Sequence, residues 1–119
     1  MAFRFESLQI WHAARKYATQ VYQLTAKFPR HEDYGLRSQL NRAVNSISMN
    51  IAEGSAKSKK SFAAYLETSV GSTVEVVSAS FLALDRSYIS QEAQGAIYQE
   101  GEKLAKSINA FRNTLRTDS

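Results

Sequence analysis

Apolar residues recur at steps of three and four along nearly the whole chain, with one proline, Pro29, and five glycines to interrupt them. Such steps place apolar side chains on one face of an α-helix, whereas a strand needs alternation of apolar and polar residues, of which the sequence has little. Breaks are few, so the helices are expected to be long. The length suits one domain, and residues 1–119 are therefore predicted to form a single all-α unit.

Four helical segments are predicted, at about residues 7–27, 33–54, 58–86 and 90–116. Ser7 is expected to cap the first helix, and Pro29 to stop it, because proline lacks an N–H group. Glu32 and Asp33 suit the positive end of the second helix, and Gly54 is expected to be its C-terminal cap. Short connections between long helices favour antiparallel neighbours, so the expected fold is an antiparallel up-down-up-down four-helix bundle.

Each segment carries an apolar stripe that would face the core. The stripe of the fourth segment is Ile97, Gly101, Leu104, Ile108, Phe111 and Leu115. The stripe of the third is Phe62, Leu66, Val70, Thr73, Val77, Ser80 and Leu84, among small residues that let a neighbouring helix approach closely. The first segment has a second stripe, Trp11, Ala18 and Tyr22, beside its main one. A large apolar area left over on a soluble protein marks an interface, so a homo-oligomer is predicted.

Charge is distributed unevenly along the chain. Residues 1–60 hold ten Lys/Arg and four Asp/Glu, a net +6, whereas residues 61–119 hold five and seven, a net −2. A basic half indicates an anionic partner. The alternative is that these charges only form a solvated surface that keeps the protein in solution.

Several classes of protein are not expected from the composition. The chain has no cysteine, which excludes disulfides, thiol catalysis and cysteine zinc sites. Its N-terminus carries charges throughout, unlike a signal peptide, and no apolar run approaches the roughly 20 residues that span a bilayer. A cytoplasmic protein with no membrane contact is expected.

A basic loop precedes the third segment. Lys57, Lys59 and Lys60 surround the expected start of that helix, where free N–H groups attract anions. The segment Gly54–Ser61 is close to a phosphate-binding P-loop, but it lacks the second glycine and follows a helix instead of a strand, so that reading is rejected. The loop is predicted to bind nucleic acid, with help from Arg37 and Arg42; a merely solvated loop is the alternative.

Polar residues form a line on the second segment. Arg42, Ser46 and Asn50 are spaced by four, Glu53 follows close to that line, and an acid at a helix C-terminus is unfavourably placed. Asparagine and serine are also mediocre helix formers, so their presence needs a reason. The pattern predicts a partly buried network of these four residues with Glu75 of the third segment; plain exposure is the alternative.

No residue cluster indicates a catalytic centre, a metal site or a cofactor. The two histidines, His12 and His31, lack partners at zinc-site spacing, and no base stands beside a serine in a recognisable pattern. Cleavage of RNA by the two histidines stays open, with only their presence to support it. No enzymatic activity is expected.

The sequence resembles the 23S ribosomal RNA intervening-sequence protein family, also called four-helix bundle proteins. The residues that carry the resemblance are Leu8-x-x-Trp11-x-x-Ala14, Phe28-Pro29, Tyr34-Gly35-Leu36-x-Ser38-Gln39-Leu40-x-Arg42-Ala43, Ser46-Ile47-x-x-Asn50-Ile51-Ala52-Glu53-Gly54 and Gly71-Ser72-x-x-Glu75. It covers nearly the whole chain. One departure is Asn41-Arg42, where the family often has two arginines.

The resemblance implies a bacterial, cytosolic, four-helical protein with no attached enzymatic activity. Some members are encoded inside insertions in 23S ribosomal RNA genes, and a related branch, the accessory proteins of diversity-generating retroelements, forms barrel-shaped pentamers that bind nucleic acid and a reverse transcriptase. The leading hypothesis is therefore a homo-oligomer, preferably a pentamer, that binds RNA or DNA. A scaffold that recruits a nucleic-acid enzyme without touching nucleic acid is the alternative.

Overall fold

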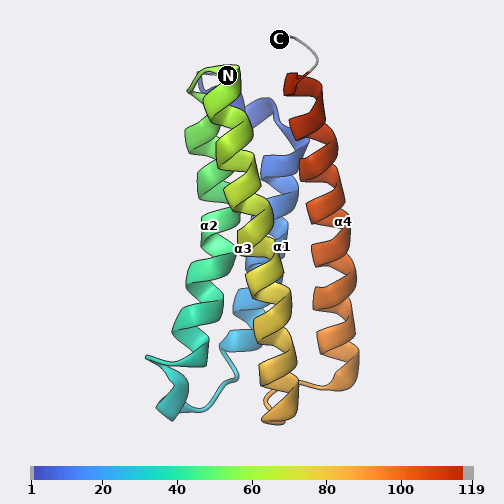
Figure 1. Ribbon diagram of the computed structural model, residues 1–119. Helices are drawn as coiled ribbons and strands as arrows, with labels where there is room; N and C mark the ends of the chain where they lie inside the picture. Colours follow the sequence, from blue (N-terminus) through green and yellow to red (C-terminus); the bar gives the residue numbers. More distant parts are fainter. Residues whose placement is uncertain (1, 117–119) are drawn as a thin grey trace.

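The computed structural model describes residues 2–116 and consists of helices joined by short connections. The elements are η1 (Arg4–Ser7), α1 (Gln9–Thr25), η2 (Arg30–Glu32), α2 (Leu36–Ser55), α3 (Lys59–Asp85) and α4 (Gln91–Arg116). Each long helix packs against the next along the chain, and α1 also packs against α4 (Figure 1). The result is an elongated body of 47 × 24 × 21 Å, and the prediction of an up-down-up-down four-helix bundle is confirmed.

The core is built from the stripes that the helix period indicates. Phe62, Ile47, Ile51 and Ile108 are fully buried, and Ile97 is nearly so. On α4 the expected seam is buried from Ile97 to Ile108 and half-buried beyond it. Burial of these side chains is the main stabilising term for a bundle of this kind.

Two predicted helix caps are wrong. Ser7 lies in η1, where its hydroxyl donates to the carbonyl of Arg4, and α1 begins after Leu8 without a side-chain cap. Gly54 is a buried helical residue of α2, and the helix ends one residue later. A Cβ on Gly54 would lie 2.6 Å from Cβ of Tyr65, so this glycine lets α2 and α3 approach closely.

The buried face of α3 is rotated relative to the predicted stripe. Beyond Leu66 the buried residues are Ser69, Ser72, Thr73, Val76, Ala79, Ser80 and Ala83, whereas Val70, Val77 and Leu84 are only half-buried. Small side chains allow the close approach of α2, and the Ser69 hydroxyl donates to the carbonyl of Ile47 at 2.9 Å. The rotation leaves Val74 and Phe81 on the surface, 60% and 44% exposed.

Candidate functional site

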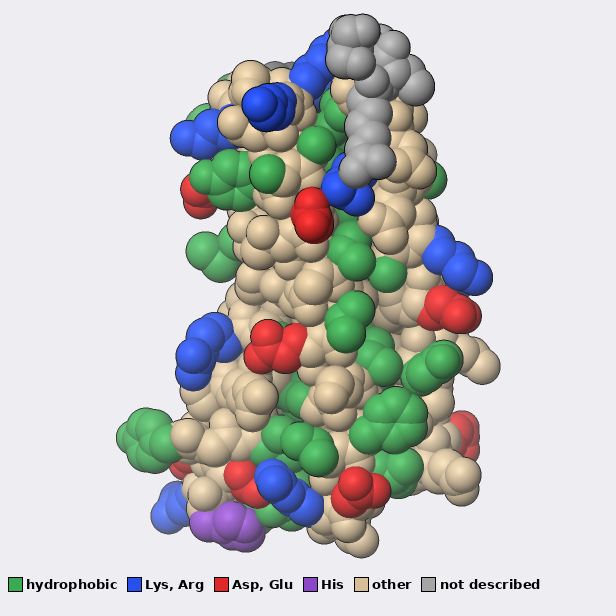
Figure 2. Space-filling view, viewed as in Figure 1, with side chains coloured by type: hydrophobic (Ala, Val, Ile, Leu, Met, Phe, Trp, Pro, Cys, Tyr) green, Lys and Arg blue, Asp and Glu red, His purple; other side chains and the backbone are tan. Residues whose placement is uncertain are grey.

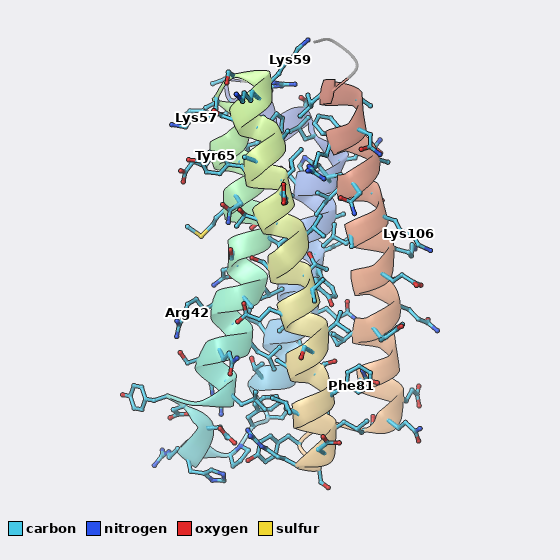
Figure 3. The ribbon with its side chains drawn as sticks, viewed as in Figure 1. Arg42, Lys57, Lys59, Tyr65, Phe81 and Lys106 are labelled. Atoms are coloured by element: carbon cyan, nitrogen blue, oxygen red, sulfur yellow. The ribbon has the colours of Figure 1, made fainter. Side chains whose placement is uncertain are left out.

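The three candidate lysines lie at the end of the bundle formed by the turn between α2 and α3. Lys57, Lys59 and Lys60 are exposed, and Lys57 and Lys59 extend from this end in Figure 3. Ser58, which lies between Lys57 and Lys59, caps the start of α3, because its hydroxyl accepts the N–H of Ser61. Arg4 of η1 joins the group, with its guanidinium 5.2 Å from the ring centroid of Phe62. We call Arg4, Lys57, Lys59 and Lys60 the lysine end.

Arg37, the fourth cation predicted to contact nucleic acid, has partners within the chain. Its guanidinium donates to the carbonyls of Thr25 and Phe28 and forms an ion pair with Asp33 at 3.0 Å. The last carbonyls of α1 have no partners within their own helix, and a cation satisfies them well. The side chain thus fastens the end of α1 to the start of α2, and its contact with nucleic acid stays a prediction.

Arg42 is exposed but distant from the lysines. It extends outward from α2 (Figure 3), and within residues 2–116 no hydrogen bond or ion pair involves its side chain. At 1.5 Å per residue, it lies about 20 Å along α2 from the lysine end. The five predicted contact residues thus do not form one surface.

The predicted polar network of α2 and α3 exists only in part. Asn50 donates to the carbonyl and the hydroxyl oxygen of Ser46, at 2.8 and 2.9 Å, and the Ser46 hydroxyl lies 2.8 Å from that of Ser72. Glu53 instead accepts the hydroxyl of Tyr65 at 2.8 Å, a bond that raises the pKa of this tyrosine.

The charged members of the predicted network do not join it. Arg42 and Glu75 are exposed, and neither has a hydrogen-bond or ion-pair partner among the residues that the structure describes. The physical reason is desolvation: uncharged hydroxyl and amide groups enter a half-buried contact at low cost, whereas charges stay in water.

Sequence reasoning missed a cluster at the opposite end of the bundle. The carboxylate of Glu32 accepts the backbone N–H of Leu36 at 2.9 Å, the hydroxyl of Tyr88 at 2.7 Å and the guanidinium of Arg86 at 3.2 Å. The hydrogen bond from the Leu36 N–H is the main reason that the pKa of Glu32 lies below its usual value, and the hydrogen bond from the Tyr88 hydroxyl is the second. Glu32 thus satisfies the start of α2, as an acid there should, and also fixes the turn between α3 and α4.

Within one chain, the two histidines lie at different ends of α1. His12 Nε2 lies 2.7 Å from the carbonyl of Glu6 at the start of α1, whereas His31 Nε2 lies 3.1 Å from the hydroxyl of Tyr88 beyond the other end of that helix. Thirteen residues of α1, Ala13 to Thr25, lie between them. Within residues 2–116, no group of three or more His, Asp or Glu side chains is placed to hold a metal ion.

Of the exposed large hydrophobic residues that the structure describes, four lie on α3 and α4 and one lies on α1. Within the second stripe of α1, Trp11 is partly covered, because it packs against Phe5, with ring centroids 4.6 Å apart, and Arg15 lies 4.7 Å over its ring. Tyr22 of the same stripe is 41% exposed. Hydrophobic side chains gather over α3 and α4 (Figure 2).

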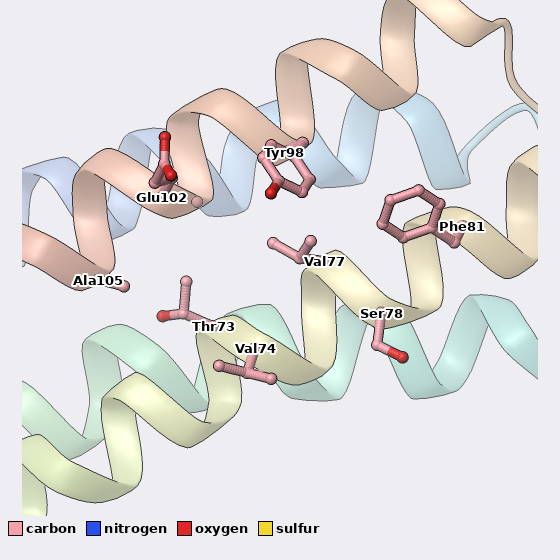
Figure 4. A pocket seen from close by; sticks show the side chains of 9 residues that line it. Thr73, Val74, Val77, Ser78, Phe81, Tyr98, Glu102 and Ala105 are labelled. Atoms are coloured by element: carbon pink, nitrogen blue, oxygen red, sulfur yellow. The ribbon is translucent and has the colours of Figure 1, made fainter.

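A groove of about 400 Å³ runs between α3 and α4 (Figure 4). Val74, Val77 and Phe81 of α3 face Tyr98 and Ala105 of α4 across it. We call this the α3–α4 groove. None of the helices that the structure describes is both long and apolar enough to cross a membrane.

Comparison with known proteins gives a family and a fold. The family described as 23S rRNA-intervening sequence protein has a model that matches residues 6–110. Among solved structures, the chain is similar to a protein of unknown function from the S23 ribosomal protein family of Bacteroides thetaiotaomicron, with a TM-score of 0.76 and 18% identity. That match covers 87% of this chain and 97% of the other, and at this identity it shows the fold alone. No curated protein matches the sequence.

Proposed function

The chain belongs to the 23S rRNA-intervening sequence protein family, and from that premise we propose that it is a non-enzymatic, homo-oligomeric bundle that binds structured nucleic acid through the lysine end. RNA is the favoured ligand, and a pentamer is the preferred assembly, a number that comes from the resemblance to the family. The single observation that carries the proposal is the gathering of Arg4, Lys57, Lys59 and Lys60 at one end of the bundle.

Phosphate contacts would supply most of the affinity at this surface. Lysine is a flexible point charge that tolerates many phosphate positions, so the lysine end fits recognition of backbone geometry better than of base sequence. Phe62 is fully buried under Arg4 and cannot stack on a base, and stacking on Phe3, which is 63% exposed beside Arg4, would be tolerant of sequence. Binding should therefore depend on salt and only weakly on sequence.

Electrophoretic mobility shifts with a structured ribosomal RNA fragment, at two salt concentrations, test this function. Lys57, Lys59 and Lys60 are replaced together by glutamate. The matched control is the triple change of Lys16, Lys103 and Lys106 to glutamate, which alters net charge equally on exposed sites away from the lysine end. Loss of about three phosphate contacts should lower the slope of log K against log salt by roughly 2–2.7.

Two results would contradict the proposal. The first is no shift of the wild-type protein at low salt. The second is an equal loss of affinity in both triple variants, which would mean that net charge alone governs the binding.

The α3–α4 groove favours one alternative, a scaffold that recruits a nucleic-acid enzyme without touching nucleic acid. An apolar groove on a protein surface is typical of protein contacts. Retention on an RNA column separates the two functions, because the scaffold needs no affinity for RNA whereas the lysine end does.

A further inference from the structure

An exposed aromatic residue lies near one end of the bundle, and an apolar groove extends toward the same end. The side chain of Tyr34, between η2 and α2, is 100% exposed. In the α3–α4 groove, Phe81 lies one helical turn before α3 ends. The ion pair of Glu32 with Arg86 joins the η2 connection to the end of α3, so both features lie toward that end of the molecule (Figure 1).

We propose that Tyr34 of one copy inserts into the α3–α4 groove of a second copy, and that this head-to-tail contact builds the homo-oligomer. The inference rests on the homo-oligomeric part of the proposed function and names its interface. We call the Tyr34 side chain the knob. The knob and the α3–α4 groove lie on different surfaces of one copy, so every copy offers one of each and the contact is heterologous. Repetition of a heterologous contact closes into a ring or continues as a filament.

The groove suits a phenol side chain. Its volume of about 400 Å³ lies within the roughly 300–1,000 Å³ of clefts that hold drug-sized ligands, so an aromatic ring fits inside it. The walls offered by Val74, Val77 and Phe81 are aliphatic and aromatic, which suits the ring. Ser78 and Glu102 stand at the edge, where they could accept the hydroxyl of a tyrosine.

The unpaired charges near the two features have opposite signs, because Asp33 and Glu32 beside Tyr34 are paired with Arg37 and Arg86. After Lys60, α3 carries no cation, and its charged residues are Glu67, Glu75 and Asp85. Asp85 lies one turn beyond Phe81, and Arg30 lies four residues before Tyr34. Among residues 2–116, no ion pair involves either of these two side chains. Contact between copies would pair them, whereas the carboxylates disfavour nucleic acid on the same face.

Other exposed apolar residues fit the groove less well. Phe3 stacks on Phe5 with ring centroids 5.7 Å apart, and Tyr22 accepts a hydrogen bond from the Asn45 amide at 2.7 Å. Met49 is less exposed than Tyr34, at 66%, and it has no ring to pack against Phe81. Of the large hydrophobic residues that the structure describes, Tyr34 is the one with a fully exposed side chain.

Mixing two variants tests the head-to-tail contact. Tyr34→Ala removes the knob, and Val74→Lys fills the groove with a cation at an exposed site that folding does not need. By light scattering after size exclusion, each variant alone should have the monomer mass of 13.3 kDa. Mixed in equal amounts, they should form a one-to-one dimer of twice that mass, because one intact knob then meets one intact groove.

Two control variants isolate the effect. Met49→Ala removes another exposed apolar side chain, and Ala64→Lys adds the same cation elsewhere on the exposed part of α3. Both should keep the wild-type mass. Circular dichroism of every variant should show unchanged helix content, so that a fall in mass is not caused by unfolding.

The outcomes separate this inference from the proposed function. Wild-type mass in Tyr34→Ala or Val74→Lys overturns the interface but leaves the homo-oligomer and its RNA binding in place. Two monomers that do not pair on mixing overturn the head-to-tail geometry. A monomeric wild type overturns both the interface and the homo-oligomer, even if the groove then binds a different protein. The wild-type protein could also form an oligomer that these variants dissociate and yet give no mobility shift with RNA. That result would support the interface and contradict the nucleic-acid part of the proposed function.

Discussion

Replacement of Gly54 by alanine is expected to destabilise the bundle, although alanine is the better helix former. Gly54 lies in the last turn of α2, and its backbone faces α3. A Cβ there would lie 2.6 Å from Cβ of Tyr65 and 2.9 Å from Cδ1 of Phe62. The Cβ of Tyr65 is fixed by its backbone, so the two helices themselves would have to move apart.

The magnitude follows from two opposing terms. Alanine gains at most about 1 kcal/mol of helix propensity over glycine, and less in a terminal turn. Forcing one more carbon into a packed contact costs about 1–3 kcal/mol, and the closeness of two Cβ atoms favours the upper half of that range. The net loss in the free energy of unfolding should be about 1–2 kcal/mol. With a urea m-value of about 1.5 kcal/mol/M, the unfolding midpoint should fall by about 1 M.

Gly71 supplies the matched control within the same bundle. It lies inside α3, and an added Cβ would meet no atom within 4 Å. Gly71→Ala should therefore raise the free energy of unfolding by about 0.5–1 kcal/mol. Urea denaturation followed by circular dichroism measures both variants. Equal stabilisation by the two substitutions would refute the close approach of α2 and α3 at Gly54.

Three further predictions concern groups that the structure places in defined contacts. Glu32→Gln should lower stability at pH 7, and the difference from wild type should vanish as pH falls through the depressed pKa of Glu32, because that carboxylate stabilises the fold only while ionised; unfolding midpoints between pH 7 and 3 measure it. Arg37→Ala should cost about 1.5–3 kcal/mol, since it removes charged hydrogen bonds to the end of α1, whereas Arg42→Ala should change stability by less than about 0.5 kcal/mol in the same denaturation assay. Tyr17→Phe should cost about 1 kcal/mol, because the buried hydroxyl donates to the carbonyl of Ile97 at 2.8 Å, and thermal unfolding would report the loss.

The bundle was predictable because a single period runs through the sequence. Steps of three and four fix which face of each helix is apolar, and short connections leave few arrangements other than antiparallel neighbours. The seam of α4 was recovered from Ile97 onward for this reason. Glu32 was also predictable, since an acid before a helix has a donor to meet in the first turn.

The orientation of α3 was not predictable from hydrophobicity. Two stripes compete on this helix, one with the larger apolar residues Val70 and Val77 and one with the small residues Ser69 and Ala79. The apolar period predicts that the stripe with the larger residues is buried. In the structure the stripe with the small residues is buried against α2, because small side chains let the two helix axes come closer. The richness of α3 in small residues was the available signal, and the exposed groove follows from it.

The sequence also could not predict which cations have partners within the chain, because this depends on how the helices pack. Arg37 and Arg42 are one and a half turns apart on the same helix, yet one satisfies the carbonyls of Thr25 and Phe28 and the other meets only water. In the sequence both residues are simply positive charges. The position where α1 ends in the fold determines that Arg37, and not Arg42, lies close to free backbone carbonyls.

The arrangement of the charged and apolar surfaces suggests how the two proposed contacts would cooperate. The lysine end lies at the turn between α2 and α3, whereas Tyr34 and Phe81 lie toward the opposite end, so self-association need not cover the cations (Figure 1). If the head-to-tail contact keeps neighbouring copies parallel, it gathers their lysine ends on one rim. Each copy then holds the next cation cluster close to an RNA that is already bound, and avidity rises without any new contact. In this arrangement each added copy contributes a further lysine end, so that RNA binding need not depend on the charge of one copy alone.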